Sequence, residues 1–374
     1  MARKRTMRKM LIGGAAVGGA AWLLRGIPSE VGVRPLHSSA ERAERVRRSP
    51  QFDGSTFINP MPESTTASAP SAGLLAELAT KRGERRPPGP VPLEALPASS
   101  TPSDRVRAAW FGHSTVLVEL DGARVLIDPV WSNRVSPSQL VGPKRLHPVP
   151  AALESLPHLD AVVISHDHYD HLDRATIIKL TRISQAPFLV PLGVGAHLEH
   201  WDVPAERIIE LDWEEAAEVA GLRIVATAAR HFSGRWLTRN DTLWGSWAIT
   251  GPQHRVFYAG DSGYFEGFGD IGRQHGPFDL TIMPVGAYSP SWPDIHMTPE
   301  EAVTAHLDVG GRLLLPVHWG TFTLALHPWA EPIERLWAEA KARDVTITVP
   351  RPGQAIDVDE APVVDGWWKT LTLD

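Results

Sequence analysis

The sequence contains no cysteine, and this absence limits the chemistry open to the chain. Disulfide bonds, thiolate zinc sites and a cysteine nucleophile are excluded, so a bound metal must be held by histidine, aspartate or glutamate. The chain also lacks a basic stripe and carries a formal net charge of −6, which argues against a nucleic-acid partner. With 43% hydrophobic and 21% charged residues over 374 positions, the composition indicates a globular protein of one large or two small domains.

The first 25 residues lack a hydrophobic run of comfortable membrane-spanning length. Arginines and lysines of the first nine positions precede an uncharged stretch from Met10 to Leu24, which Arg25 ends. A basic segment followed by a short apolar run is typical of an export signal, and the same run could act as an N-terminal membrane anchor. We therefore expect residues 1–25 to place the rest of the chain outside the cytoplasm. A cytoplasmic protein with an apolar start is the alternative, and cleavage of the leader is left open.

Residues 26–104 have little apolar periodicity and are rich in proline, serine and arginine. This composition predicts a linker with short local helices near Ser39–Arg47 and Leu74–Lys81. Because Phe52, Phe57 and Pro60 could anchor it, we expect the linker to be partly ordered against the domain that follows. That globular domain is predicted to span residues 105–374.

Short strand-like runs dominate the predicted domain, first as hairpins and then in alternation with helices. The predicted strands are Val106–Phe111, Thr115–Leu120, Arg124–Ile127, Val162–Ile164, Phe188–Pro191, Ile208–Leu211, Leu222–Ala229, Gly245–Ile249, Val256–Ala259, Asp279–Pro284, Leu313–Val317 and Val345–Thr348. The predicted helices are Arg174–Ile183, capped by Asp173, then Gly195–Trp201, Phe265–His275, Pro299–Leu307 and Pro328–Ala342. This mixture favours an α/β (α+β) fold with two sheets sandwiched between helices.

A knot of histidines and carboxylates follows the apolar run Val162–Ile164. The residues His166, His168, Asp170 and His171 come just past the carboxyl end of the predicted strand, where open α/β sheets usually carry their chemistry. So many polar side chains cannot all pack as core residues. Imidazole nitrogens and carboxylate oxygens are ligands that zinc takes in catalytic sites. A histidine-rich surface loop is the alternative, but the spacing His-x-His-x-Asp-His favours a metal site.

Three later polar residues also follow strand-like runs: His231, Asp261 and His318. One such histidine alone would more often be structural, but together with the knot they form a constellation of metal ligands. We expect two ligand groups that share Asp261: His166, His168 and His231 for one metal, and Asp170, His171 and His318 for the other. Two zinc ions are the expected cofactor, and iron or manganese stays open because the same ligands accept them. No organic cofactor site is predicted.

The ligand set resembles that of the metallo-β-lactamase superfamily, whose fold is a four-layer αββα sandwich. Further motifs match one branch: His113-Ser114-Thr115-Val116, Gly142-Pro143-Lys144-Arg145, Leu243-Trp244-Gly245-Ser246-Trp247, Ala259-Gly260-Asp261-Ser262-Gly263-Tyr264 and His318-Trp319-Gly320-Thr321-Phe322. They are similar to motifs of the N-acyl-phosphatidylethanolamine-hydrolysing phospholipase D family and its bacterial relatives. The resemblance covers about residues 105–350, nearly the whole predicted domain.

Two departures from this branch bear on function. Asp167 stands between the first two histidines, where the animal enzymes carry asparagine, and we expect its side chain to point away from the metals. The N-terminal part does not resemble the membrane- and dimer-forming region of the animal enzymes. Lipid access and oligomeric state are therefore left open.

Two divalent ions about 3.5–4 Å apart can share a water molecule and lower its pKa towards neutrality. Such a site can hydrolyse a phosphodiester, but also a lactone, a lactam or another carboxyl ester, because the ligands define the nucleophile and not the substrate. The branch resemblance favours a phospholipase D-type phosphodiesterase that converts N-acyl-phosphatidylethanolamine-like lipids to phosphatidate and N-acylethanolamine. A lactone, lactam or other carboxyl-ester hydrolase is the alternative enzyme, and a metal-binding protein without activity is the non-enzymatic alternative.

The candidate catalytic residues are Asp261, as the bridging carboxylate, His296 and Tyr288. The resemblance implies that His296 binds or protonates phosphate oxygens, with a capping or surface role as the alternative. Tyr288 could donate to a substrate oxygen or simply pack. Asp128 could orient a ligand histidine or initiate a turn. The expected partners are a phospholipid or another phosphodiester substrate and a membrane surface, with no nucleic acid; headgroup and acyl-chain preference stay open.

Overall fold

The computed structural model of the chain describes residues 33–62, 83–96, 101–235, 237–360 and 362–371. The predicted leader at residues 1–25 and the predicted helix Leu74–Lys81 lie outside these ranges. Among the helices of the described ranges, none has both the length and the apolar character needed to cross a membrane.

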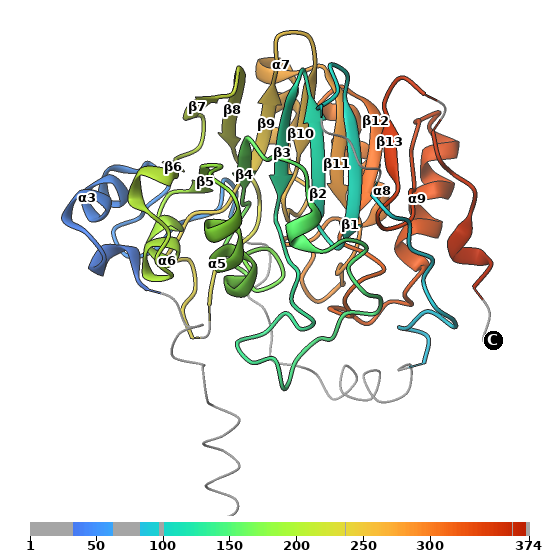
Figure 1. The fold of residues 1–374 in the computed structure, drawn as a ribbon, viewed down its shortest axis with the longest axis horizontal. Helices are drawn as coiled ribbons and strands as arrows, with labels where there is room; N and C mark the ends of the chain where they lie inside the picture. Colours follow the sequence, from blue (N-terminus) through green and yellow to red (C-terminus); the bar gives the residue numbers. More distant parts are fainter. Residues whose placement is uncertain (1–32, 63–82, 97–100, 236, 361, 372–374) are drawn as a thin grey trace, which may run out of the picture.

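A seven-stranded mixed sheet forms the first half of the domain (Figure 1), with the strand order β13-β1-β2-β3-β4-β5-β6. Its strands are β1 (Arg107–Gly112), β2 (Thr115–Leu120), β3 (Ala123–Ile127), β4 (Ala161–Val163), β5 (Phe188–Pro191), β6 (Ile208–Leu211) and β13 (Ala355–Asp357). The hairpins β1-β2 and β2-β3 are antiparallel, whereas β3, β4, β5 and β6 run parallel. Parallel strands end at the same edge of a sheet, so the loop after β4 leaves from the edge at which β3 and β5 end.

The second sheet has six strands in the order β12-β11-β10-β9-β8-β7. They are β7 (Ala216–Val219), β8 (Leu222–Thr227), β9 (Ser246–Thr250), β10 (Arg255–Tyr258), β11 (Phe278–Pro284) and β12 (Gly311–Val317). From β7 to β10 the neighbours pair antiparallel, whereas β10, β11 and β12 pair in parallel. The carboxyl ends of β8 and β10 therefore lie at the same edge of this sheet as that of β12.

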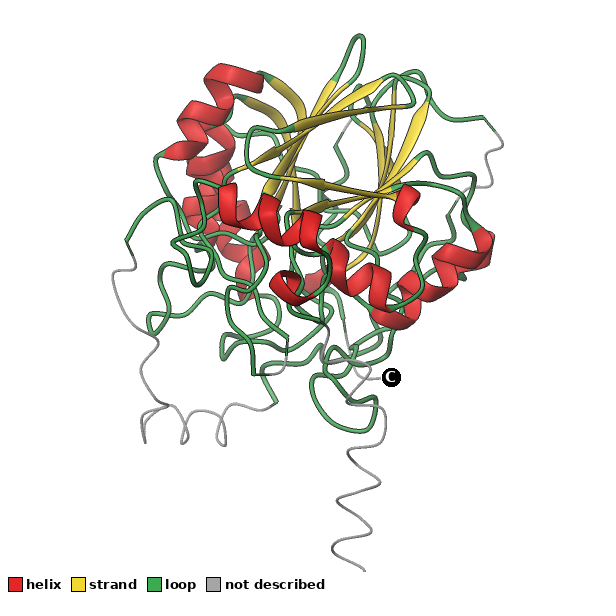
Figure 2. Ribbon diagram, turned by 90° about the vertical axis from the view of Figure 1, so that its left-hand side faces the viewer, coloured by secondary structure: helices red, strands yellow, loops and turns green. Residues whose placement is uncertain are grey.

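Helices cover the outer sides of the two sheets, which gives the four layers of an αββα sandwich (Figure 2). The α-helices are α3 (Ala40–Arg48), α5 (Arg174–Ile183), α6 (Gly195–His200), α7 (Gly267–His275), α8 (Pro299–Asp308) and α9 (Glu331–Ala342). Short 3₁₀ turns are η1 (Pro35–His37), η2 (Leu153–Ser155), η3 (Ala205–Arg207) and η4 (Trp367–Lys369). The side chain of Asp173 caps α5 as predicted, accepting a hydrogen bond from the backbone N–H of Ala175.

The main hydrophobic core lies between the sheets, and a second core lies under α5. Val163 of β4 packs into the first core with Trp247 and Tyr258 of the second sheet. Its neighbour Val162 packs into the second core with Ile177 of α5. Since successive side chains of a strand point to opposite faces, a strand covered on both sides must be apolar throughout. This burial explains why β4 is visible in the sequence as an unbroken apolar run.

The predicted strands agree with the structure except in three places. Val345–Thr348 is not a strand, because only Ile347 forms a bridge, to Leu314. The strands β7 and β13 were not predicted. The first is an edge strand that is mostly half-exposed, and the second is a three-residue edge strand whose pairing with β1 bridges more than 200 residues of sequence, so neither has a local apolar pattern.

Part of the predicted linker lies on the domain. The helix α3 and the turn η1 lie beside α6 and β6 (Figure 1), and Arg42 of α3 forms ion pairs with Glu199 and Glu210. The helix matches the one predicted near Ser39–Arg47 to within one residue at each end. Phe57, named as a possible anchor, is fully buried.

Candidate metal centre

The predicted ligands come from loops that follow four strands: the knot follows β4, and His231, Asp261 and His318 follow β8, β10 and β12. They meet around the carboxylate of Asp261. Its Oδ2 atom lies 3.1 Å from Nε2 of His171, 3.1 Å from Nε2 of His318, 3.8 Å from Nε2 of His231 and 3.9 Å from Nε2 of His166. One carboxylate oxygen from the second sheet thus faces imidazoles from both sheets.

The structure brings together the members of each predicted ligand group, and it also places His166 and His171 beside Asp261. In the first group, Nδ1 of His168 lies 2.8 Å from Nε2 of His166 and 3.4 Å from Nε2 of His231. In the second group, Oδ2 of Asp170 lies 3.4 Å from Nε2 of His318 and 3.5 Å from Nε2 of His171. Each group brings its ligand atoms within 4.8 Å of one another, close enough to hold one ion.

Unpaired buried atoms test whether this donor set fits metal ions. Oδ1 of Asp261 and Nδ1 of His318 are buried and have no hydrogen-bond partner, while Nε2 of His171 and of His318 face carboxylates of the cluster. A buried polar atom without a partner is costly, so such a cluster requires something to bind it. Three imidazoles on one side, two imidazoles and a carboxylate on the other, and a carboxylate between them match the donors that zinc uses. The residues therefore fit two divalent ions.

The electrostatics of the cluster divide its histidines into two kinds. Burial holds the pKa of His166 and of His231 well below the usual range, so both are neutral and offer a lone pair. Burial also opposes protonation of His171 and His318, but Asp261 and Asp170 outweigh it and raise the pKa of His318 to about 9. The neighbouring protonated imidazoles overcome burial at Asp261 and hold the pKa of its carboxyl well below the usual value.

Groups behind the ligands fix the orientation of their rings. Oδ2 of Asp128 lies 2.6 Å from Nδ1 of His171, while its Oδ1 accepts a hydrogen bond of 2.7 Å from the backbone N–H of Ser165. Tyr258 donates its hydroxyl proton to the same carboxylate. Nδ1 of His231 donates to the carbonyl of Ile295 at 2.8 Å. Such partners leave Nε2 of each ring facing the cluster. The sequence left two roles open for Asp128, orienting a ligand histidine or initiating a turn, and its position here is the orienting one.

His113, which the sequence placed only in a branch motif, belongs to the centre. It is buried, and its Nε2 lies 2.8 Å from Oδ2 of Asp170. Burial, with the charge of His318, lowers the pKa of His113 to about 3, so its ring is neutral and donates this hydrogen bond. A signal was present in the sequence, since His113 directly follows the strand β1 as other site residues follow their strands.

His296 lies at the border between the cluster and a cavity of about 510 Å³. Its Nδ1 is 3.9 Å from Oδ2 of Asp261, and its ring centroid is 5.1 Å from those of His231 and His318. Burial lowers its pKa to about 4. The structure therefore brings His296 to the predicted ligands.

Tyr288 lies in the wall of the same cavity rather than among the ligands. Its hydroxyl donates to Oε1 of Glu331 at 2.6 Å, and its ring stacks on that of His327 with a centroid distance of 4.7 Å. The guanidinium of Arg335 lies 4.8 Å from the ring centroid, on the cavity side of α9. Burial and the hydrogen bond to Glu331 raise the pKa of the Tyr288 hydroxyl.

Asp167 points away from the cluster, as expected. Its Oδ2 lies 3.1 Å from Nε2 of His197, and its Oδ1 accepts a hydrogen bond of 2.6 Å from the backbone N–H of Gly234. Both carboxylate oxygens of Asp167 therefore have hydrogen-bond partners outside the metal centre.

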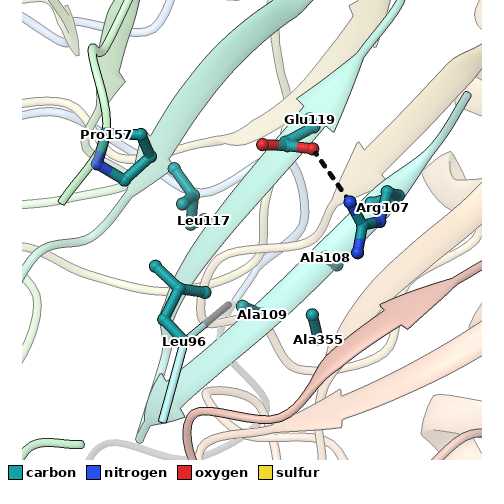
Figure 3. Close-up of a pocket in the computed structure, with 8 residues that line it drawn as sticks. All are labelled: Leu96, Arg107, Ala108, Ala109, Leu117, Glu119, Pro157 and Ala355. Carbon is teal, nitrogen blue, oxygen red and sulfur yellow. Dashed lines mark ion pairs between the residues drawn. The ribbon is translucent and has the colours of Figure 1, made fainter. Parts of the chain in front are cut away.

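A smaller pocket lies elsewhere, against β1, β2 and β13 (Figure 3). It is lined by Leu96, Pro157, Ala355 and side chains of the first two strands, among them Arg107 and Glu119, which face each other at 3.8 Å. Its described lining has no residue in common with the metal centre. The cavity of about 510 Å³ beside His296 is the candidate substrate site, because it is large and borders the ligands.

Comparison with known proteins agrees with this geometry. The family described as "Beta-lactamase superfamily domain" matches residues 123–319. An uncharacterized protein of Mycobacterium tuberculosis is 50% identical over 366 residues, covering 96% of this chain and 98% of that protein. The N-acyl-phosphatidylethanolamine-hydrolyzing phospholipase D 1 of Caenorhabditis elegans is 34% identical over 332 residues, covering 83% and 92%. A metallo hydrolase from Ignicoccus hospitalis superposes with a TM-score of 0.54 at 24% identity, covering 68% of this chain and 99% of its own, and supports the fold alone.

Proposed function

This chain belongs to the metallo-β-lactamase superfamily, in the branch similar to N-acyl-phosphatidylethanolamine-hydrolysing phospholipase D, and is a metal-dependent hydrolase. From this premise we propose that it is a dinuclear zinc phosphodiesterase of the phospholipase D type. Its substrates would be N-acyl-phosphatidylethanolamine-like lipids, and its products phosphatidate and N-acylethanolamine.

The observation that carries the proposal is the position of His296. This histidine lies between a two-group ligand cluster and a cavity of about 510 Å³, which is within the size range of small-molecule sites. The cavity wall contains Tyr288, Glu331 and Arg335, so it offers polar contacts close to the reacting centre. A phosphodiester held by the cluster could therefore place one of its substituents in this cavity.

The residues of the chain have distinct parts in this reaction. His166, His168 and His231 would hold one ion and Asp170, His171 and His318 the other, with Asp261 between them. When bound, the two ions would supply a water activated near neutral pH and positive charge for the substrate oxygens. Because its pKa is about 4, His296 would act as a neutral imidazole that donates a hydrogen bond to a phosphate oxygen.

We extend the proposal to the location of the enzyme. The basic and apolar character of residues 1–25 supports export or membrane anchoring, with the domain outside the cytoplasm. A lipid substrate is consistent with work at a membrane surface.

The test is hydrolysis of N-acyl-phosphatidylethanolamine vesicles by the purified, zinc-loaded chain, with phosphatidate and N-acylethanolamine measured by mass spectrometry. Asp261→Asn is the matched control, because it keeps the side-chain shape but removes the shared charge. We expect turnover to fall by at least about a hundredfold in this variant. Wild-type protein that forms no more phosphatidate than Asp261→Asn would refute the proposal, and hydrolysis of lactones, lactams or esters instead would establish the alternative.

A further inference from the structure

The segment of residues 33–62, here called the N-terminal arm, reaches the metal centre at both of its ends. It begins beside α6 at Val33, passes along β6 through α3, and ends next to His231 at Pro62. The sequence placed this segment in a linker, yet its contacts are specific and partly buried.

The middle of the arm is held firmly. Arg42 is 6% exposed and donates to Glu210 at 2.6 Å and to Glu199 at 2.8 and 2.9 Å. Two partly buried carboxylates surround one buried guanidinium, so loss of both partners would leave an uncompensated buried charge. Phe57 is fully buried in a small core with Ala229 and Trp244. These anchors leave little freedom to the ends of the arm.

The first end is connected to the ligand knot through one histidine. The backbone N–H of Val33 donates to Nδ1 of His197 at 3.1 Å, so the ring proton of His197 is on Nε2. That Nε2 lies 3.1 Å from Oδ2 of Asp167 and donates to it. Asp167 stands between His166 and His168, so this chain of hydrogen bonds orients the backbone that carries both ligands.

The second end contacts the third ligand of the same group. Oδ1 of Asn59 accepts a hydrogen bond of 2.9 Å from the backbone N–H of His231. The carbonyl of Pro62 accepts one of 3.2 Å from Nη2 of the neighbouring Arg230. Phe57 and Ala229 belong to the same small core, so the arm approaches three consecutive residues of the loop that presents His231.

Within the described residues, the arm contacts only the first ligand group, which also has a domain partner in Ile295, whereas the outer partners of the second group come from the domain. Asp128, after β3, is paired with His171, and His113, after β1, is hydrogen-bonded to Asp170. The two groups therefore differ in the additional contact that the arm makes with the first.

We infer that the N-terminal arm is a positioning element for one metal ion of the pair. It holds the backbone of His166, His168 and His231 in the arrangement that binds this ion, and Asn59 is its contact with His231. The inference rests on the metal centre of the proposed function but not on the identity of the substrate.

The test is zinc binding to the full chain with Asn59→Ala, by competition with a chromophoric chelator and by metal content after desalting. One of the two equivalents should bind about 10–100-fold more weakly, the usual effect of removing an outer partner of a ligand, while the other keeps its wild-type affinity. Asn59→Asp keeps the acceptor oxygen and should restore binding of the weakened equivalent.

Asp53→Ala is the matched control on the same arm. Oδ1 of Asp53 also accepts backbone hydrogen bonds, but from Ser55 and Thr56 within the arm, so this variant should bind both equivalents normally. His197→Gln interrupts the other end and should reproduce the selective loss, even if Asn59→Ala folds poorly. Unchanged affinity for both ions in Asn59→Ala and His197→Gln, or equal weakening of both ions, would overturn the inference. Neither outcome depends on lipid hydrolysis.

Discussion

At the scale of single residues, the centre is a balance of buried charges around Asp261. Without metal, protons balance part of the charge of the cluster: His171 and His318 have raised pKa values and pair with Asp170 and Asp261, whose pKa values are held low. Divalent ions replace these protons, so uptake of metal must release protons. The first group starts from neutral rings and needs no such exchange, because burial already keeps the pKa of His166 and His231 low.

Asp128 sets the orientation and basicity of His171 through a 2.6 Å contact with its Nδ1. In Asp128→Asn the amide oxygen can still accept from Ser165, but the charge that supports the imidazole is lost. We expect zinc affinity to fall about 10–100-fold with the fold retained. Isothermal titration and circular dichroism measure both. Asp160→Asn, which changes a carboxylate that accepts from the backbone of Arg124, is the control, and wild-type zinc affinity in Asp128→Asn would contradict the assigned role.

At the scale of elements, α8 connects the cavity to the core. Thr298 and Glu301 form a capping box at its N-terminus, and both residues line the cavity beside His296. Its other end carries His306, whose Nδ1 lies 2.7 Å from Oγ1 of Thr281 in β11. The helix therefore depends on a buried, neutral histidine at its contact with the second sheet.

This contact predicts a pH dependence of stability. Burial lowers the pKa of His306 to about 4, from an ordinary value of 6.5. Between these values the unfolded chain binds a proton that the folded chain does not, so stability rises with pH and is lost as the pH falls through this window. We compare the unfolding free energy of the wild type with that of His306→Gln. The difference between them should fall by up to about 3 kcal/mol from about pH 7 to pH 4.

Denaturant unfolding at both pH values provides the measurement. His158→Gln, at a side chain that is 76% exposed, is the control for the loss of an exposed histidine. If the difference in unfolding free energy between wild type and His306→Gln does not change with pH, His306 makes no pH-dependent contribution to stability.

At the scale of the whole molecule, the metal centre joins the two sheets. The knot leaves the first sheet after β4, while His231, Asp261 and His318 leave the second sheet after three of its strands. Ions bound between them would tie the sheets together at one edge of the sandwich, beside the hydrophobic core that joins them along their faces. An ion that binds only the folded chain must also stabilise it.

Removal of metal should therefore lower the thermal unfolding temperature. Free zinc at about a thousand times its dissociation constant stabilises the folded state by about 4 kcal/mol per site. Calorimetry of the chelator-treated chain, before and after zinc is restored, measures this effect, and magnesium serves as the control ion because it prefers oxygen ligands. The response to zinc should be smaller in Asp261→Ala, which lacks the shared ligand. An unfolding temperature that zinc does not change would contradict a role for metal in joining the sheets.

Much of the fold and of the candidate site could be predicted locally. The strand β4 and residues 313–317 of β12 are buried and are unbroken apolar runs, and the capped helix α5 begins and ends where its sequence predicts. The edge strands β7 and β13 could not be found this way, because pairing with a distant strand stabilises them more than their own pattern does. Among the site residues, the dense group from His166 to His171 could be recognised in the sequence as metal ligands. His113 was not predicted as a site residue, because a single histidine after a strand is more often structural.

The sequence by itself determined which residue types can bind metal and that they follow strand ends, because ligand chemistry and strand burial are both properties of short stretches. Only the tertiary structure decided how those stretches meet. It set the distances from Asp261 to the imidazoles around it, turned the hydroxyl of Tyr288 to Glu331, and brought Asn59 from the predicted linker to His231. These contacts join residues up to 172 positions apart in the chain, so they follow from packing of the whole domain and leave no local pattern.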